Sequence, residues 1–91
     1  MDQFHAHIYK YQLPTSNTDT VAMPKGAQIL CVQVQKDTPY IWALVDPDLP
    51  TETRRFSIYG TGWDITSPPG KYVGTFQLAS GLVFHVFEER D

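Results

Sequence analysis

The sequence predicts an all-β fold, a small antiparallel β-sandwich or partly open barrel of about seven short strands. Proline and glycine, with 7 and 6 residues, divide the chain into short segments. Those segments are rich in β-branched and aromatic residues, and several alternate apolar with polar side chains, as half-buried strands do. No window sustains the apolar period of an amphipathic helix. Turn signals recur about every 8 to 12 residues, which favours a sandwich or a barrel.

Seven strands are expected, each bounded by turn residues. Because most connections are short, most neighbouring strands are expected to form antiparallel hairpins. The expected strands span residues 6–12, 18–23, 28–35, 40–45, 54–59, 71–77 and 82–88.

The first strand carries histidines and tyrosines on one face, because side chains alternate along a strand. That face is either a surface for a protein partner or a second core face. The two faces are formed by His5, His7, Tyr9 and Tyr11 on one side and Phe4, Ala6 and Ile8 on the other. The second strand is short and polar, which is typical of an edge strand, and Pro24-Lys25-Gly26 makes the following turn.

The third and fourth strands are expected near the centre of the fold. Residues 28–35 alternate apolar and polar side chains, and residues 36–39 form a hairpin loop. Residues 40–45 are apolar on both faces, which predicts a central strand or one covered on both sides. Trp42 is expected in the core.

The fifth strand is predicted to point Phe56 and Ile58 inward, and Arg55, Ser57 and Tyr59 outward. The connections at 46–51 and 60–70 are the candidates for crossing between two sheets. The sixth and seventh strands are joined by a short turn at 78–81. In the seventh, Leu82, Phe84 and Val86 oppose Val83, His85 and Phe87.

Composition limits the possible partners. The chain of 91 residues fits one domain, residues 1–91, and carries 7 basic and 10 acidic side chains, a net charge of −3. Direct nucleic-acid binding is not expected, because phosphate contacts need clustered Lys and Arg. The single cysteine, Cys31, excludes an intrachain disulfide and a Cys-built zinc site. With no leader pattern and no long apolar run, we expect a cytoplasmic protein without membrane contact.

The histidines suggest a metal site only weakly. His5 and His7 share a strand face, and His85 would join them if the last strand paired near the first. No carboxylate is obviously in register, so two surface histidines are the favoured interpretation, and neither metal nor cofactor is expected. Asp46 and Asp48 suit a turn better than an acid–base pair or a cation site. A metal-dependent enzyme built on His5, His7, Asp46 and Asp48 is the alternative that this interpretation disfavours.

A ligand site is suggested around the long loop. Arginine offers forked donors for phosphate, and Trp and Tyr offer stacking faces for a base. The Gly60-Thr61-Gly62 segment resembles a phosphate loop only loosely, since no helix follows it. The candidate ligand residues are Arg54, Arg55, Tyr59, Trp63, Lys71 and Tyr72.

The alternative is structural. Trp63 would then anchor the long loop to the core, and the arginine pair would answer the charges of Glu52 and Asp48. No nucleophile elbow is present, and Cys31 lies in an apolar strand where a thiol behaves as a small hydrophobe. The chain is therefore not expected to be an enzyme, and no catalytic residue is assigned.

An ordered series of motifs resembles a family of small phage and prophage proteins classed as a domain of unknown function. The resemblance runs from about Ile8 to Glu88. Its motifs are MPxGAxILxVQxQ from Met23, PxxWALVDP from Pro39, GTG at 60–62, YVGTFQ from Tyr72 and LVFHVFE from Leu82.

The resemblance implies an accessory protein of a phage or prophage that acts by stoichiometric binding in the host cytoplasm. The expected role is an anti-defence factor, which either inhibits a host defence protein or sequesters a small nucleotide signal. An acidic surface suits the first version, and the Arg54, Arg55 and Trp63 set suits the second. The alternative is a small virion structural or assembly protein. A homo-oligomer is expected because 13% of the residues are aromatic.

Overall fold

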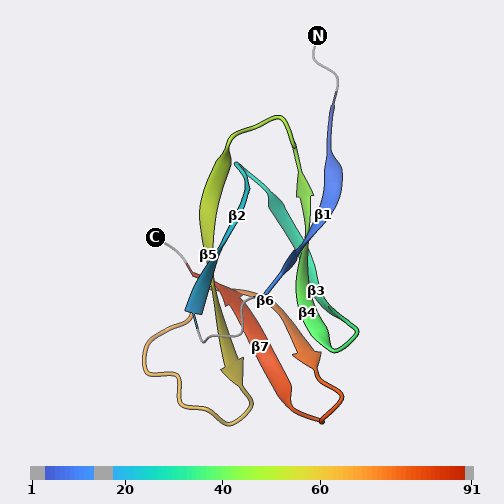
Figure 1. Cartoon of the computed structure of the whole chain (residues 1–91). Helices are drawn as coiled ribbons and strands as arrows, with labels where there is room; N and C mark the ends of the chain where they lie inside the picture. The colour runs from blue at the N-terminus through green and yellow to red at the C-terminus, as the bar shows by residue number, and fades with distance from the viewer. Residues whose placement is uncertain (1–3, 14–17, 90–91) are drawn as a thin grey trace.

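The computed structural model describes residues 4–13 and 18–89, and these form seven strands in two antiparallel sheets (Figure 1). The all-β sandwich prediction is confirmed, and the described strands do not close into a barrel. The strands are β1 (His7–Gln12), β2 (Thr18–Pro24), β3 (Gln28–Gln35), β4 (Thr38–Val45), β5 (Thr51–Gly60), β6 (Lys71–Gln77) and β7 (Val83–Glu88). The described part of the chain contains no helix long and apolar enough to span a lipid bilayer.

The sheets have three and four strands, in the orders β1-β4-β3 and β2-β5-β7-β6. β4 is central, as its two apolar faces predicted, and β2 is an edge strand, as its polar sequence predicted. β4 begins earlier than expected because Lys36 and Asp37 both take positive φ and make a two-residue turn. β5 begins earlier because β2 pairs with it as far as the Pro24 and Thr51 partners.

One long hairpin passes through both sheets. β3 and β4 pair in the first sheet, and their continuations β2 and β5 pair in the second. At the corner the Lys25 N–H donates to the Pro50 carbonyl at 2.8 Å. The 46–51 connection therefore crosses between sheets, as expected. The 60–70 connection does not, because β5 and β6 belong to the same sheet with β7 between them.

The core fills the space between the sheets. From β4 it takes Ile41, Ala43 and Val45, and the opposite face of that strand carries Trp42. Placing Trp42 in the core was wrong: its ring is only partly buried, beside Lys10, whose Nζ lies 5.8 Å from the ring centroid. The other buried apolar residues of the core are Leu13, Met23, Ala27, Val32, Phe56, Ile58, Phe76 and Val86.

Ser57 lies on the outer face of β5 as predicted, opposite Phe87, but it is not exposed. Phe56 and Ile58 point inward as predicted, but Ser57 is also buried, and its hydroxyl donates to the Glu89 carboxylate at 2.5 Å. Glu89 follows β7, and its N–H donates to the Arg55 carbonyl at 2.8 Å. The end of the chain that the structure describes thus covers this polar position, which the sequence of β5 alone does not reveal.

The histidine and tyrosine face of β1 turns toward the core side of its sheet, because Tyr9 and Tyr11 pair with Ala43 and Ile41. Tyr11 packs against the core, and burial raises the pKa of its phenol, with Tyr9 adding to the effect. Tyr9 is still 40% exposed. Of the two interpretations of this face, the core one holds for Tyr11.

Candidate functional site

The six predicted ligand residues do not form one cluster. Three of them, Arg54, Lys71 and Tyr72, line a common cleft. Arg55 and Tyr59 lie on the opposite face of β5, because neighbouring side chains on a strand point to opposite sides. Trp63 lies in the loop after β5 and is absent from the lining of this cleft.

We call the shared space the bulge cleft. It lies where β3 and β6, edge strands of the two sheets, contact each other, and its volume is about 300 Å³. Ala27, Gln28, Ile29 and Leu30 line it from one side, Lys71, Tyr72 and Val73 from the other, with Arg54 and Glu88 between them.

Both strands are irregular beside this cleft. The β3 pairing shifts between Ile29 and Cys31, and the β6 pairing shifts between Tyr72 and Gly74. Each shift inserts one extra residue, which leaves backbone groups outside the ladder and bends the strand. The extra residues of the two bulges, Leu30 and Val73, both line this one cleft, which sequence patterning alone cannot locate.

The floor of the cleft is an ion pair. The Arg54 guanidinium donates from Nε and Nη2 to the two carboxylate oxygens of Glu88, a bidentate arrangement. Its Nη1 donates to the Ala27 carbonyl at 2.9 Å and to Glu52 at 3.4 Å. The hydrogen bond to Glu88 raises the pKa of Arg54, against an opposing effect of burial. Each side chain of the Arg54–Glu88 pair is only 17% exposed.

Arg54 is therefore a structural residue and its charge is already neutralised. The expected pairing of the arginines with Glu52 and Asp48 holds for Arg54 and Glu52. Asp48 instead accepts from His5, at 3.0 Å. Two side chains of the predicted set remain at the rim of the cleft, and both are exposed: Lys71 and Tyr72.

Tyr72 also belongs to a row of rings on the outer face of the larger sheet. Its ring centroid lies 5.5 Å from that of Phe87, which lies 5.9 Å from that of Tyr59. The Tyr72 hydroxyl lies 2.6 Å from the Thr75 hydroxyl, which holds the phenol in place. Phe87 was not singled out from the sequence, because its strand reads as apolar on both faces.

His85 is excluded as a partner for the histidines of β1. It lies in β7, which pairs with β5 and β6 rather than with β1. Its two ring nitrogens lie 2.9 Å from the Thr75 hydroxyl and 2.8 Å from the Thr61 hydroxyl. The predicted condition for a third histidine ligand is therefore not met.

Trp63 packs as a loop anchor. Its backbone N–H donates to the Gly60 carbonyl at 3.0 Å. Its indole ring lies so close to Gly60 that a Cβ atom at position 60 would meet the ring at 2.5 Å. The ring also contacts Phe84 edge-on, with centroids 6.1 Å apart. These contacts support the anchoring alternative for Trp63, although half of the side chain is exposed.

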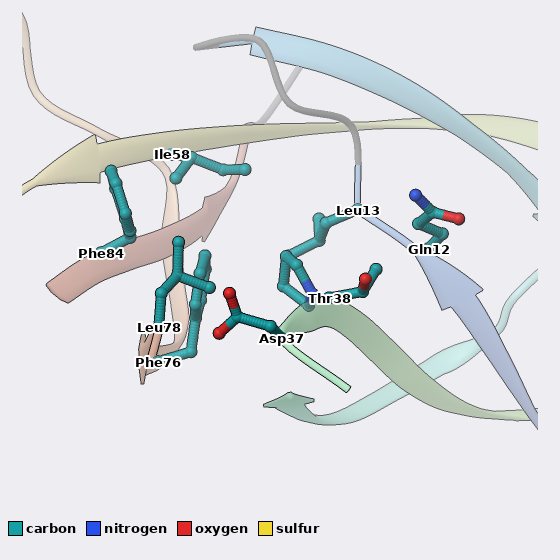
Figure 2. Close-up of a pocket in the computed structure, with 9 residues that line it drawn as sticks. Gln12, Leu13, Asp37, Thr38, Ile58, Phe76, Leu78 and Phe84 are labelled. Atoms are coloured by element: carbon teal, nitrogen blue, oxygen red, sulfur yellow. The ribbon is translucent and has the colours of Figure 1, made fainter. Parts of the chain in front are cut away.

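A second cavity, of about 270 Å³, opens between the sheets near the two hairpin turns (Figure 2). The Asp37 carboxylate at its edge accepts the Ala79 N–H at 2.6 Å, which ties one hairpin to the other. The walls are mainly apolar and suit an apolar group rather than an anion. They consist of Leu13, Pro39, Ile58, Phe76, Leu78 and Phe84, with Gln12 and Thr38 beside Asp37.

Comparison with the curated proteins finds no match, and comparison with the solved structures finds none. A family model described as Domain of unknown function (DUF7352) matches residues 5–91, almost the whole chain. This confirms the resemblance to a family of unknown function, while the phage or prophage origin stays a prediction. The chain belongs to the DUF7352 family.

Proposed function

We propose that this protein is a non-catalytic binding protein that holds a small anionic ligand with an aromatic ring, such as one nucleotide, in the bulge cleft. The observation that carries the proposal is the position of Lys71 and Tyr72, adjacent and exposed at the rim of a cleft of about 300 Å³. That volume lies at the lower end of the range for ligand sites, about 300–1,000 Å³.

Each part of the cleft has a role in this proposal. The Lys71 ammonium is a point charge for a phosphate. The Tyr72 ring, held by Thr75 and Phe87, offers a face on which a base stacks. The Arg54–Glu88 pair keeps the floor rigid and neutral, so that it adds no second free cation. Because Glu88 is engaged by Arg54, the proposal assigns it no acid–base role.

The biological setting that we propose is the cytoplasm of a phage host. There the protein acts as an anti-defence factor that sequesters a nucleotide signal by stoichiometric binding. The sequence resemblance to phage and prophage proteins supports this setting. Inhibition of a host defence protein through the acidic surface is the other form of the same role, supported by the net charge of −3.

The test is native mass spectrometry and calorimetry of the full chain with linear and cyclic nucleotides. We expect one nucleotide per chain, and a loss of affinity of about tenfold or more in Tyr72→Ala and in Lys71→Ala, since stacking on one ring is worth roughly 1–3 kcal/mol. Arg55→Ala is the matched control, because Arg55 is an exposed cation of β5 that does not line the cleft.

Equal weakening by Arg55→Ala and Lys71→Ala would show a diffuse charge effect and would contradict the site. Absence of any nucleotide adduct would contradict the nucleotide class and leave the protein-partner form of the role. A pull-down from host lysate would then identify the partner.

A virion or assembly role is the second candidate, and one observation favours it. β1 lies at the edge of the smaller sheet. Phe4, just before this strand, is 88% exposed, and Ile8, within it, is 60% exposed. An exposed edge with apolar side chains is a template for pairing with another strand. Detection of the protein in purified virions would favour this candidate.

A further inference from the structure

We propose that His5, Asp46 and Asp48 form a binding site for one divalent transition-metal ion, of which Zn²⁺ is the best match. This site is separate from the bulge cleft and does not depend on the proposed function. One ligand atom from each of the three side chains lies within 4.8 Å of the other two. Imidazole together with carboxylates is a donor set typical of Zn²⁺ rather than of Mg²⁺.

Strand register explains why these residues meet. β1 pairs with β4 so that His7 lies opposite Val45. If this antiparallel register is continued two residues beyond the start of β1, His5 falls opposite position 47. The His5 imidazole therefore lies close to both aspartates that flank Pro47. The sequence offers these residues together with His7 as possible ligands of a metal, and the strand register shows that His5 is the histidine that meets the aspartates.

The distances suit an ion after small movements. The His5 Nδ1 lies 3.0 Å from a carboxylate oxygen of Asp48 and 3.9 Å from one of Asp46. Donor atoms at about 2.0–2.2 Å from a zinc ion are separated from one another by distances of this order. The contact between His5 and Asp48 is exposed, so replacing it by metal ligation sacrifices little stability.

The two sides of the site are held separately. In the connection before β5, the Asp48 N–H donates to the Asp46 carboxylate at 3.0 Å, and Pro47 fixes the backbone between them. On the other side the His5 ring packs edge-on against His7, with centroids 5.2 Å apart. His7 in turn lies 3.3 Å from the Tyr9 hydroxyl through its Nδ1. The imidazole therefore comes from a different segment and is positioned independently of the carboxylates.

The expected consequence is a link between two parts of the fold. A bound ion would join the segment before β1 to the connection that crosses between the sheets. Three protein ligands leave a coordination position for water or for a side chain of a partner. Binding would therefore stabilise the folded chain by mass action, in proportion to the logarithm of the free metal concentration.

The experiment uses metal-free full-length protein, titrated with ZnCl₂ and separately with MgCl₂, and followed by native mass spectrometry, calorimetry and the histidine signals in NMR. We expect one Zn²⁺ per chain, a shift of the His5 ring signals, and little or no Mg²⁺ binding. In His5→Ala and Asp48→Asn the affinity for Zn²⁺ should fall at least about tenfold, because even changes to residues behind the ligands cost roughly 10–100-fold.

His85→Ala is the matched control, a histidine of the larger sheet that should leave Zn²⁺ binding unchanged. Circular dichroism shows whether each variant is folded, and since all three ligands are at least partly exposed we expect them to be. No Zn²⁺ adduct at a large molar excess would overturn the proposal. An adduct that persists in His5→Ala, or that disappears in His85→Ala, would overturn it as well.

Discussion

Arg54 and Arg55 are neighbours in the sequence, but their side chains lie on opposite faces of β5 in different environments. Arg54 points between the sheets and engages Glu88, Glu52 and the Ala27 carbonyl, while Arg55 points to the outer face and is exposed. A guanidinium that is largely removed from solvent requires a compensating charge and hydrogen-bond acceptors for its N–H groups. Its role is therefore to hold β5, β7 and the corner before β3 together.

Removing one partner of this pair should cost much more than removing its neighbour. We expect Glu88→Gln to lower the free energy of unfolding by about 2 kcal/mol, because it removes the bidentate partner of a partly buried guanidinium and leaves Glu52, at 3.4 Å, as its carboxylate partner. Arg55→Ala should change it by less than about 0.5 kcal/mol, as is usual for surface positions. Urea denaturation measures both.

The double change Arg54→Met with Glu88→Leu provides the internal check. Replacing both charges by apolar groups of similar volume should recover most of the stability lost in Glu88→Gln. If Glu88→Gln unfolds at the same urea concentration as Arg55→Ala, the pair contributes little and this account of Arg54 is wrong.

For single residues, the sequence predicted which residue types could bind a ligand, but not which of these residues lie together in the structure. The alternation of side chains already separates Arg54 from Arg55. The grouping of Arg54 with Lys71 and Tyr72 depends on β6 lying next to β3, and no local pattern records that contact. For the same reason, His5, Asp46 and Asp48 could be named from the sequence as possible metal ligands, but their contact could not be derived from it.

β3 and β6 show how two strands of different sheets approach closely. Gly74 lies in β6 directly over Val32 of β3, so that a Cβ at position 74 would come within 2.6 Å of the Val32 Cγ1. Val32 is buried, and its side chain has little room to move. The absence of a side chain at position 74 is what allows the sandwich to close on this side.

Gly74→Ala should therefore destabilise the fold by about 1–3 kcal/mol, the usual cost of overpacking a core. Gln77→Ala, at an exposed position of the same strand, is the matched control. Thermal unfolding followed by circular dichroism measures the difference.

Val32→Ala tests the cause, because it removes the methyl group that the new Cβ would meet. The two changes together should cost less than the sum of the two single changes, as expected for residues in contact. Strict additivity would mean that Gly74 is needed for another reason, such as its backbone conformation.

The strands themselves were predictable. Residues 28–35 and 71–77 match β3 and β6 at both ends, because alternation and turn residues define strands locally. The bulges and the path of the 60–70 connection were not, since both depend on which strands pair. Trp42 was misplaced because β4 is apolar on both faces and only the packing of the sheets decides which face is inside.

At the scale of the whole molecule, the two sheets meet along one pair of edge strands and leave the other two edge strands apart from it. β3 and β6 are the pair that meets, whereas β1 and β2 are the remaining edge strands of the two sheets. Lys10 in the middle of β1 is the kind of charge that discourages strand pairing. Ile8, two residues earlier, is exposed and apolar. β1 therefore carries one side chain that discourages pairing with another strand and one that favours it.

A homo-oligomer that forms through β1 should be disrupted by a charge at Ile8. We expect Ile8→Lys to shift the assembly to monomer in analytical ultracentrifugation. Leu82→Lys is the matched control, because Leu82 is 59% exposed against 60% for Ile8 and lies near the turn between β6 and β7. A wild-type monomer at all concentrations, or equal dissociation by both variants, would rule out this interface.

The long hairpin that passes through both sheets has a consequence for how the chain reaches its fold. Pairing can start at the Lys36–Asp37 turn, advance along β3 and β4, continue past the corner and end at the Thr18 and Ser57 partners. Each new pair then closes only a small additional loop, which keeps the entropic cost of every step low. The β3–β4 and β2–β5 pairings would accordingly form as one continuous process. Loss of one of these pairings would favour loss of the other.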